Sequence, residues 1–199
     1  MNGFRPIDFD DILREAVKNL FKLRLPNGKT RWGFKEIRYG SNSAVPETLL
    51  RLFPNGKIVH TIRHPFSTIE SCVTAWNFKA LKEAMRTGDD DAIAKHYRQY
   101  ANRWIWTTGY FLDLESRNPE SVRLSRLETF DRDLPGLLEF LGVPHFEGAS
   151  SLPMTAINTS WISAKGRGGN EIADWLAKFR ASVAPLISEM AEKAGYEIG

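Results

Sequence analysis

The segment from Lys57 to Ser71 combines residue types that could bind an anion. Its sequence, KIVHTIRHPFSTIES, predicts a strand that ends at Arg63, a tight turn with Pro65, and then a helix. In an open α/β sheet, ligands bind beyond the carboxyl ends of the strands. The first turn of a helix offers unpaired N–H groups and a partial positive charge, so Arg63 and this helix together suit a phosphate. Ser67 or Ser71 could add a hydroxyl donor. The alternative is that Arg63 pairs with a surface carboxylate and Ser71 is an ordinary helix serine.

A glycine-rich run, Lys165-Gly166-Arg167-Gly168-Gly169, is a second candidate for phosphate binding. Glycine lets the backbone approach a ligand closely, and Lys165 or Arg167 brings positive charge. The alternative is a flexible surface loop.

The histidines and the cysteine do not form a recognisable site. His60 lies inside the predicted strand, where a lone histidine is more often a core residue than a base. His64 could cap the following helix, and His96 and His145 are too scattered for a metal-ligand pattern. Cys72, the only cysteine, excludes an internal disulfide and cysteine-rich zinc sites. We expect it to be a buried helix residue and not a nucleophile.

Alternating short strands and helices must position these residues. The sequence predicts strands at 31–36, 57–63 and 121–127. It predicts helices that begin after an Asp8 cap and that cover Val45–Phe53, Pro65–Trp76, Asp89–Leu114, Leu134–Leu141 and the segment after Asn170, where Pro185 should kink or split the helix. Region 78–88 is left unassigned. No hairpin signal joins the strands, which favours a parallel sheet with helices on both faces.

Length and composition predict one globular domain over residues 1–199. Twelve Phe and six Trp imply a large aromatic core, in which we expect Tyr97, Tyr100, Trp104 and Trp106. No apolar run approaches the ~18 residues of a membrane span, and the N-terminus does not resemble a signal peptide, so a cytoplasmic protein is expected. The net charge of +3 is too small to indicate nucleic-acid binding, but it is compatible with a small anionic ligand.

Five motifs, in the right order, resemble sulfotransferases that use 3′-phosphoadenosine 5′-phosphosulfate (PAPS). Residues 58–71 are similar to the 3′-phosphate-binding segment of that family, and WGFKE at 32–36 to its W-G-x-K-E strand. The runs VRLSRLETF (122–130), LLEFLGVP (137–144) and KGRGG (165–169) follow in family order. The resemblance covers residues 31–199 and rests on the order of the motifs, because none of them is strong alone.

The resemblance implies an α/β fold with a P-loop-NTPase-like parallel sheet flanked by helices. It implies that Arg63 and Ser71 hold the 3′-phosphate and that Lys165, Gly166 and Arg167 close over it. PAPS would be the donor, 3′-phosphoadenosine 5′-phosphate (PAP) the product, and no metal would be required.

The resemblance also suggests the catalytic pair. Sulfuryl transfer needs a base for the acceptor proton and cations on the transferring and leaving oxygens. By resemblance, Lys35 would face the sulfuryl or bridging oxygen and Glu36 would be the base. Adjacent strand residues point to opposite faces, so both reach one site only if the strand ends between them. The alternative for Glu36 is a salt bridge with Arg38.

Two departures from the family pattern qualify these expectations. The family begins with a strand and a phosphosulfate-binding loop, often R-S-G-T-[ST], which this sequence does not contain. We therefore expect a domain that lacks its first strand and this loop, truncated at the N-terminus, and whose exposed sheet edges favour a homodimer. Leu127 stands where an adenine-contacting tyrosine often lies, which puts the contacts to the base in doubt.

The predicted function is transfer of a sulfuryl group from PAPS to a hydroxyl or amine of a small-molecule, glycan or peptide acceptor, with no nucleic-acid or membrane partner. The alternative is a non-catalytic remnant or a nucleotide-binding interaction module with the same fold. A nucleotide kinase would need a G-x-x-x-x-G-K-[ST] loop, which is absent.

Overall fold

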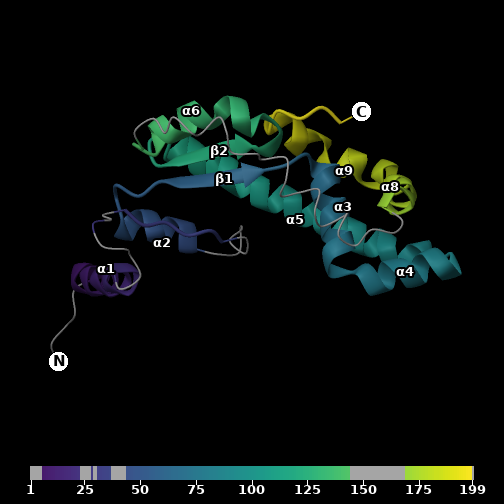
Figure 1. Ribbon diagram of the computed structural model, residues 1–199, viewed down its shortest axis with the longest axis horizontal. Coiled ribbons are helices and arrows are strands. Elements are labelled where there is room, and N and C mark those ends of the chain that lie inside the picture. Colours follow the sequence, from purple (N-terminus) through teal and green to yellow (C-terminus); the bar gives the residue numbers. More distant parts are fainter. Residues whose placement is uncertain (1–5, 23–27, 29–30, 37–43, 144–168, 199) are drawn as a thin grey trace.

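The computed structural model describes residues 6–22, 28, 31–36, 44–143 and 169–198. In chain order, the described elements are α1 (Pro6–Lys22), α2 (Val45–Leu52), β1 (Ile58–Ile62), α3 (Pro65–Trp76), α4 (Phe78–Thr87), α5 (Asp90–Arg117), β2 (Val122–Arg126), the 3₁₀ helix η1 (Leu127–Thr129), α6 (Phe130–Phe140), α8 (Gly169–Ala177) and α9 (Arg180–Lys193). Together they form a helix-rich α/β arrangement (Figure 1).

The strands β1 and β2 pair in parallel, in a register that runs from Ile58 opposite Val122 to Ile62 opposite Arg126. This confirms the predicted parallel pairing. Both carboxyl ends therefore lie at one edge of the sheet, and Figure 1 shows α3 starting where β1 ends, with α9 beside it.

The strand predicted at residues 31–36 is wrong, because these residues form neither a strand nor a helix. Their alternating aromatic side chains pack on α1 instead. The rings of Trp32 and Phe34 stack on Phe21, at centroid distances of 4.0 and 5.8 Å. The aromatic side chains therefore contact a helix and not a neighbouring strand, and Phe34 stays 47% exposed.

Helix α5 is the central support of the fold and confirms the long helix predicted from its spacing. The side chain of Asp89 caps it by accepting a 3.2 Å hydrogen bond from the backbone N–H of Asp91. Its 28 residues extend over about 42 Å, from α4 to the sheet (Figure 1). One face is buried along its whole length, through Ile93, Tyr97, Ala101, Trp104, Thr108, Phe111 and Leu114. Trp106, expected in the core, is 65% exposed, because it lies on the opposite side of the helix.

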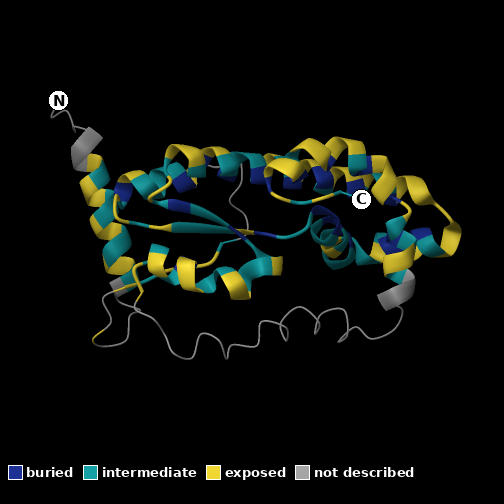
Figure 2. Cartoon of the chain, turned by 90° about the horizontal axis from the view of Figure 1, so that it is seen from above, coloured by how far each residue is buried: buried dark blue, intermediate teal, exposed yellow. Residues whose placement is uncertain are grey.

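The largest core cluster is purely helical. It joins α3, α4 and α5 to α8 and α9, through residues such as Ile69, Leu81, Tyr97 and Ile187. A smaller cluster of Phe111, Leu114 and Val122 packs α5 under the sheet. Figure 2 shows the exposed residues along the outer sides of the helices. None of the helices in the described ranges has both the length and the apolar character needed to span a bilayer.

Several helix ends differ from the sequence predictions. Helix α1 begins at Pro6, before the predicted Asp8 cap, and α4 occupies the region that the sequence left unassigned. Pro185 lies inside α9 without splitting it. The break falls earlier, between α8 and α9, because Phe179 turns into the helical core and is only 6% exposed. Helix α6 starts at Phe130, four residues before the prediction.

Candidate anion-binding site

The turn between β1 and α3 lies at the carboxyl edge of the sheet and carries Arg63. Pro65 is in the first turn of α3, where its missing N–H leaves no acceptor unpaired and its fixed φ favours the helix. The backbone N–H of Thr68 makes the first helical bond, 3.0 Å to the His64 carbonyl. The N–H groups of Phe66 and Ser67 precede this bond, so they have no acceptor within the helix.

The carbonyl of Arg63 is anchored to α5. It accepts a 3.1 Å hydrogen bond from the indole N–H of Trp104, and the hydroxyl of Thr68 donates to it at 3.3 Å. Trp104 is 6% exposed and packs with Ile62 and with Ala191 of α9. The turn is therefore fixed to the buried face of the central helix.

The other side of the turn is held by Glu128 of η1. Its Oε1 accepts a 2.7 Å hydrogen bond from the backbone N–H of His64, and its Oε2 accepts a 2.8 Å bond from the hydroxyl of Tyr196. The ring of Tyr196 also contacts His64 edge to face, with centroids 5.5 Å apart. The turn, η1 and the segment after α9 thus meet at one point.

These contacts shift the ionisation of Glu128 and Tyr196 in opposite directions. Partial desolvation raises the pKa of the Glu128 carboxyl, but the hydrogen bonds from His64 and Tyr196 and the charge of Arg63 outweigh it, so the pKa is lowered. For Tyr196, burial, together with the hydrogen bond to Glu128 and the charge of that carboxylate, raises the pKa of the phenol well above its usual range. At neutral pH, Glu128 is an anion and Tyr196 is a neutral donor.

Arg63 is a half-buried residue, and no carboxylate in the described part of the chain forms a salt bridge with it. The charges of Glu128 and Arg63 interact. The two carboxylate oxygens of Glu128, however, accept hydrogen bonds from the His64 N–H and the Tyr196 hydroxyl. The alternative of a surface ion pair for Arg63 is thus not observed among these residues. Its charge remains available for an external anion.

Ser71 lies on α3, two turns after the start of the helix, and is exposed. Ser67 is one helical turn before it, so the two hydroxyls share a face. Six residues separate Pro65 from Ser71, which corresponds to about 9 Å along the helix axis. Arg63 and Ser71 therefore belong to one turn–helix unit, with Ser67 between them.

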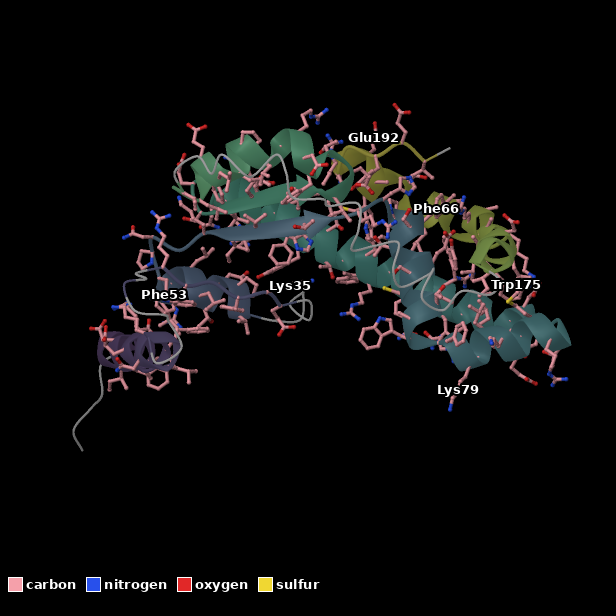
Figure 3. The ribbon with its side chains drawn as sticks, viewed as in Figure 1. Lys35, Phe53, Phe66, Lys79, Trp175 and Glu192 are labelled. Atoms are coloured by element: carbon pink, nitrogen blue, oxygen red, sulfur yellow. The ribbon has the colours of Figure 1, made fainter. Side chains whose placement is uncertain are left out.

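The other predicted site residues are not all placed by the structure. Lys35 is exposed and Glu36 half-buried on the irregular segment. In Figure 3, Lys35 lies below β1, between α2 and the carboxyl end of that strand. Lys165, Gly166 and Arg167 lie outside the described residues. Within the described part, no hydrogen bond or ion pair joins Lys35 to the Arg63 turn.

His60 packs against the core, as the sequence suggested, whereas Cys72, expected to be buried, is only partly buried. His60 stacks on Phe111, with ring centroids 3.9 Å apart, and its burial lowers its pKa to about 4. It is therefore neutral at pH 7 and packed against the core. Cys72 is half-buried on α3, and burial raises the pKa of its thiol, which disfavours the reactive thiolate. The described residues hold no cluster of three or more His, Cys, Asp or Glu that could bind a metal.

A hollow of about 450 Å³ lies elsewhere, on the exposed face of α5. It is lined by Asp91, Ala94, Lys95, Arg98, Gln99 and Asn102. All six residues come from one helix, so the hollow is a surface depression without opposing walls, and it does not include the residues of the turn.

Sequence reasoning found Arg63 but missed the residues that hold it. Trp104 was expected to lie in the core, yet nothing in its spacing marks its N–H as a partner of the turn. Glu128 follows the end of β2 by two residues. Because parallel strands end at the same edge of a sheet, this position could have indicated that Glu128 lies near Arg63. No local pattern connects Tyr196 to either residue.

The fold and the turn define an α/β protein with a candidate anion-binding site beyond the carboxyl ends of two parallel strands. A comparison with protein families matches residues 10–114, slightly more than half of the chain, to the sulfotransferase family. The chain belongs to this family. The match includes Lys35, Glu36, Arg63 and Ser71. No curated protein and no solved structure gives a significant match to the chain.

Proposed function

We propose that this protein, a single domain, transfers a sulfuryl group from PAPS to a hydroxyl or amine acceptor. The observation that carries the proposal is the Arg63 turn. It presents a guanidinium without a described ionic partner, beside the start of a helix, at the carboxyl edge of a parallel sheet. Membership of the sulfotransferase family supports PAPS as the source of the anion.

The 3′-phosphate of the nucleotide is the group that this turn would bind. Arg63 would make charge-assisted hydrogen bonds to the phosphate oxygens, which are stronger than bonds between neutral groups. The N–H groups of Phe66 and Ser67 and the positive end of α3 would add to them. Ser71 would donate from its hydroxyl, and we assign Lys165, Gly166 and Arg167 to the closing loop.

Lys35 and Glu36 are the proposed catalytic residues. The acceptor oxygen or nitrogen attacks sulfur and forms a new bond to it, while the S–O bond to the 5′-phosphate breaks and PAP leaves with that electron pair. Glu36 would take the proton of the acceptor, and Lys35 would stabilise the charge that develops on the bridging oxygen. The acceptor is a small molecule, a glycan or a peptide group, and the protein would act in the cytoplasm.

Calorimetric titration with PAP and with adenosine 5′-phosphate tests the proposed phosphate site. The wild type should bind PAP at least tenfold more tightly, which corresponds to ~1.4 kcal/mol. Arg63→Ala should abolish this difference. Arg98→Ala, which removes an exposed arginine of α5, should preserve it. If the folded wild type binds both nucleotides equally, the proposed 3′-phosphate site is wrong.

A second candidate is a nucleotide-binding module that transfers no sulfate. The observation that motivates it is that the sequence contains no phosphosulfate-binding loop of the form R-S-G-T-[ST]. Incubation with PAPS and a panel of phenol, sugar and amine acceptors separates the two functions. Nucleotide binding without PAP release above the uncatalysed rate would favour the module.

A further inference from the structure

We propose that Glu128 is a positioning residue, which fixes the peptide group between Arg63 and His64 and so directs the arginine towards the 3′-phosphate. The inference rests on the proposed function and extends it to a residue outside the segment that matches the family. Glu128 itself would not touch the nucleotide.

One peptide group is held from two opposite sides. In a trans peptide, the C=O and the N–H point in opposite directions. The carbonyl of Arg63 accepts from the indole of Trp104 at 3.1 Å, and the N–H of His64, in the same peptide group, donates to Glu128 at 2.7 Å. Two partners on opposite sides prevent this peptide plane from rotating, and its orientation sets the direction in which the Arg63 side chain leaves the turn.

Glu128 is itself held in place by the C-terminal segment. Its second oxygen accepts the 2.8 Å hydrogen bond from Tyr196. The residue before Tyr196 is fixed in turn, because the guanidinium of Arg126 donates to the Gly195 carbonyl at 2.7 Å. Gly195 has φ +76°, and a Cβ there would lie 2.8 Å from Arg126. The chain after α9 thus packs closely against the end of β2. Glu128 links it to the turn, because one oxygen binds Tyr196 and the other binds the N–H of His64.

The carboxylate of Glu128 has two opposing effects on the proposed binding of phosphate at the turn. Its hydrogen bonds order the turn, whereas its negative charge near Arg63 repels an incoming phosphate. The lowered pKa of Glu128 keeps that charge at neutral pH. Glutamine separates the two effects, because its carbonyl oxygen can still accept from His64 while the charge is lost. Alanine removes both.

The experiment compares Glu128→Ala, Glu128→Gln and a matched control. Glu115 is a suitable control, because its carboxylate also accepts a backbone N–H, from Leu124 at 3.1 Å, but within β2 and not at the turn. For each folded variant, calorimetry gives the ratio of the dissociation constants for adenosine 5′-phosphate and PAP. Glu128→Ala should lower this ratio about tenfold, since a hydrogen bond to a charged group is lost. Glu128→Gln should keep the ratio within about threefold or raise it, and Glu115→Ala should leave it unchanged.

Amide hydrogen exchange provides a readout that needs no ligand. The N–H of His64 should exchange faster in Glu128→Ala than in the wild type, and it should remain protected in Glu128→Gln. Unchanged exchange in Glu128→Ala would overturn the inference, as would an unchanged ratio or tighter PAP binding in both variants. In all these cases the wild type still prefers PAP, so the proposed function survives. Equal binding of both nucleotides by the wild type would overturn the proposed function and this inference together.

Discussion

The turn that carries Arg63 and the segment that carries Lys35 are held in different ways. The turn is fixed by hydrogen bonds from residues that are distant in the chain, Trp104 and Glu128. The segment at 31–36 is held by aromatic stacking on α1, through Trp32 and Phe34, and by a 3.0 Å hydrogen bond from Arg31 to the Leu141 carbonyl. Stacking places a ring on a surface, whereas a hydrogen bond fixes the direction of a single group.

This difference indicates which part of the site is ordered before a ligand arrives. The Arg63 turn is preorganised, because the peptide group between Arg63 and His64 already has a hydrogen-bond partner on each side. Ring stacking of the neighbouring aromatics does not by itself fix the direction of the exposed Lys35 side chain. We infer that the protein binds the phosphate with residues already in place and that Lys35 is oriented in the complex with the donor. The three predictions that follow test the two halves of this comparison.

The largest effect is expected from Trp104→Ala, which removes the anchor of the turn. A buried Trp replaced by Ala lowers the free energy of unfolding by about 3–5 kcal/mol. Trp106→Ala, on the same helix but at a 65% exposed position, should change it by less than about 0.5 kcal/mol. Urea denaturation of both variants measures the difference. Equal losses would show that the turn is not anchored through Trp104.

A pH-dependent loss of stability is expected from His60, which lies on β1 three residues before Arg63. Its pKa is about 4 in the folded protein and ~6.5 in the unfolded chain. Between these values the unfolded chain binds more protons, so stability is complete above pH ~6.5 and falls as the pH is lowered towards 4, by up to about 3 kcal/mol. Unfolding measured from pH 7.5 to 4 should show this slope.

The His60→Gln variant should lose this part of the pH dependence, since glutamine does not titrate. His96→Gln, on α5, should retain the wild-type slope because His60 is still present. If His60→Gln has the wild-type slope, the packing of His60 on Phe111 does not suppress its protonation.

The third prediction concerns Lys35, on the segment 31–36. If Lys35 acts on the sulfuryl or bridging oxygen, Lys35→Ala should lower kcat about 10²-fold and leave the affinity for PAP unchanged, because PAP has no sulfuryl group. Turnover at saturating PAPS and calorimetry with PAP measure the two quantities. Lys79→Ala, an exposed lysine of α4, should change neither. A parallel loss of PAP affinity in Lys35→Ala would place Lys35 with the phosphate-binding residues.

Much of the local structure could be predicted because local forces produce it. The boundaries of α3 agree with the prediction at both ends, since Pro65 starts a helix and the chain after it has helical spacing. The start of α5 agrees with the prediction to within one residue, and Asp89 caps it there. Where packing competes with a local signal, the prediction failed. Residues 31–36 stack on a helix instead of forming a strand, and Pro185 is tolerated because Val183 and Ile187 are buried on either side of it.

The same distinction between local sequence signals and tertiary packing applies to the candidate site. The chain specifies Arg63 at a strand end, followed by Pro65 and a helix, because the identity and spacing of neighbouring residues decide such a unit. Only the tertiary structure brings Trp104 to the Arg63 carbonyl, Glu128 to the His64 N–H and Tyr196 to Glu128, across 41, 64 and 68 residues. Contacts of that length depend on how β1, β2, α5 and the chain after α9 pack together. No pattern within one segment records this packing.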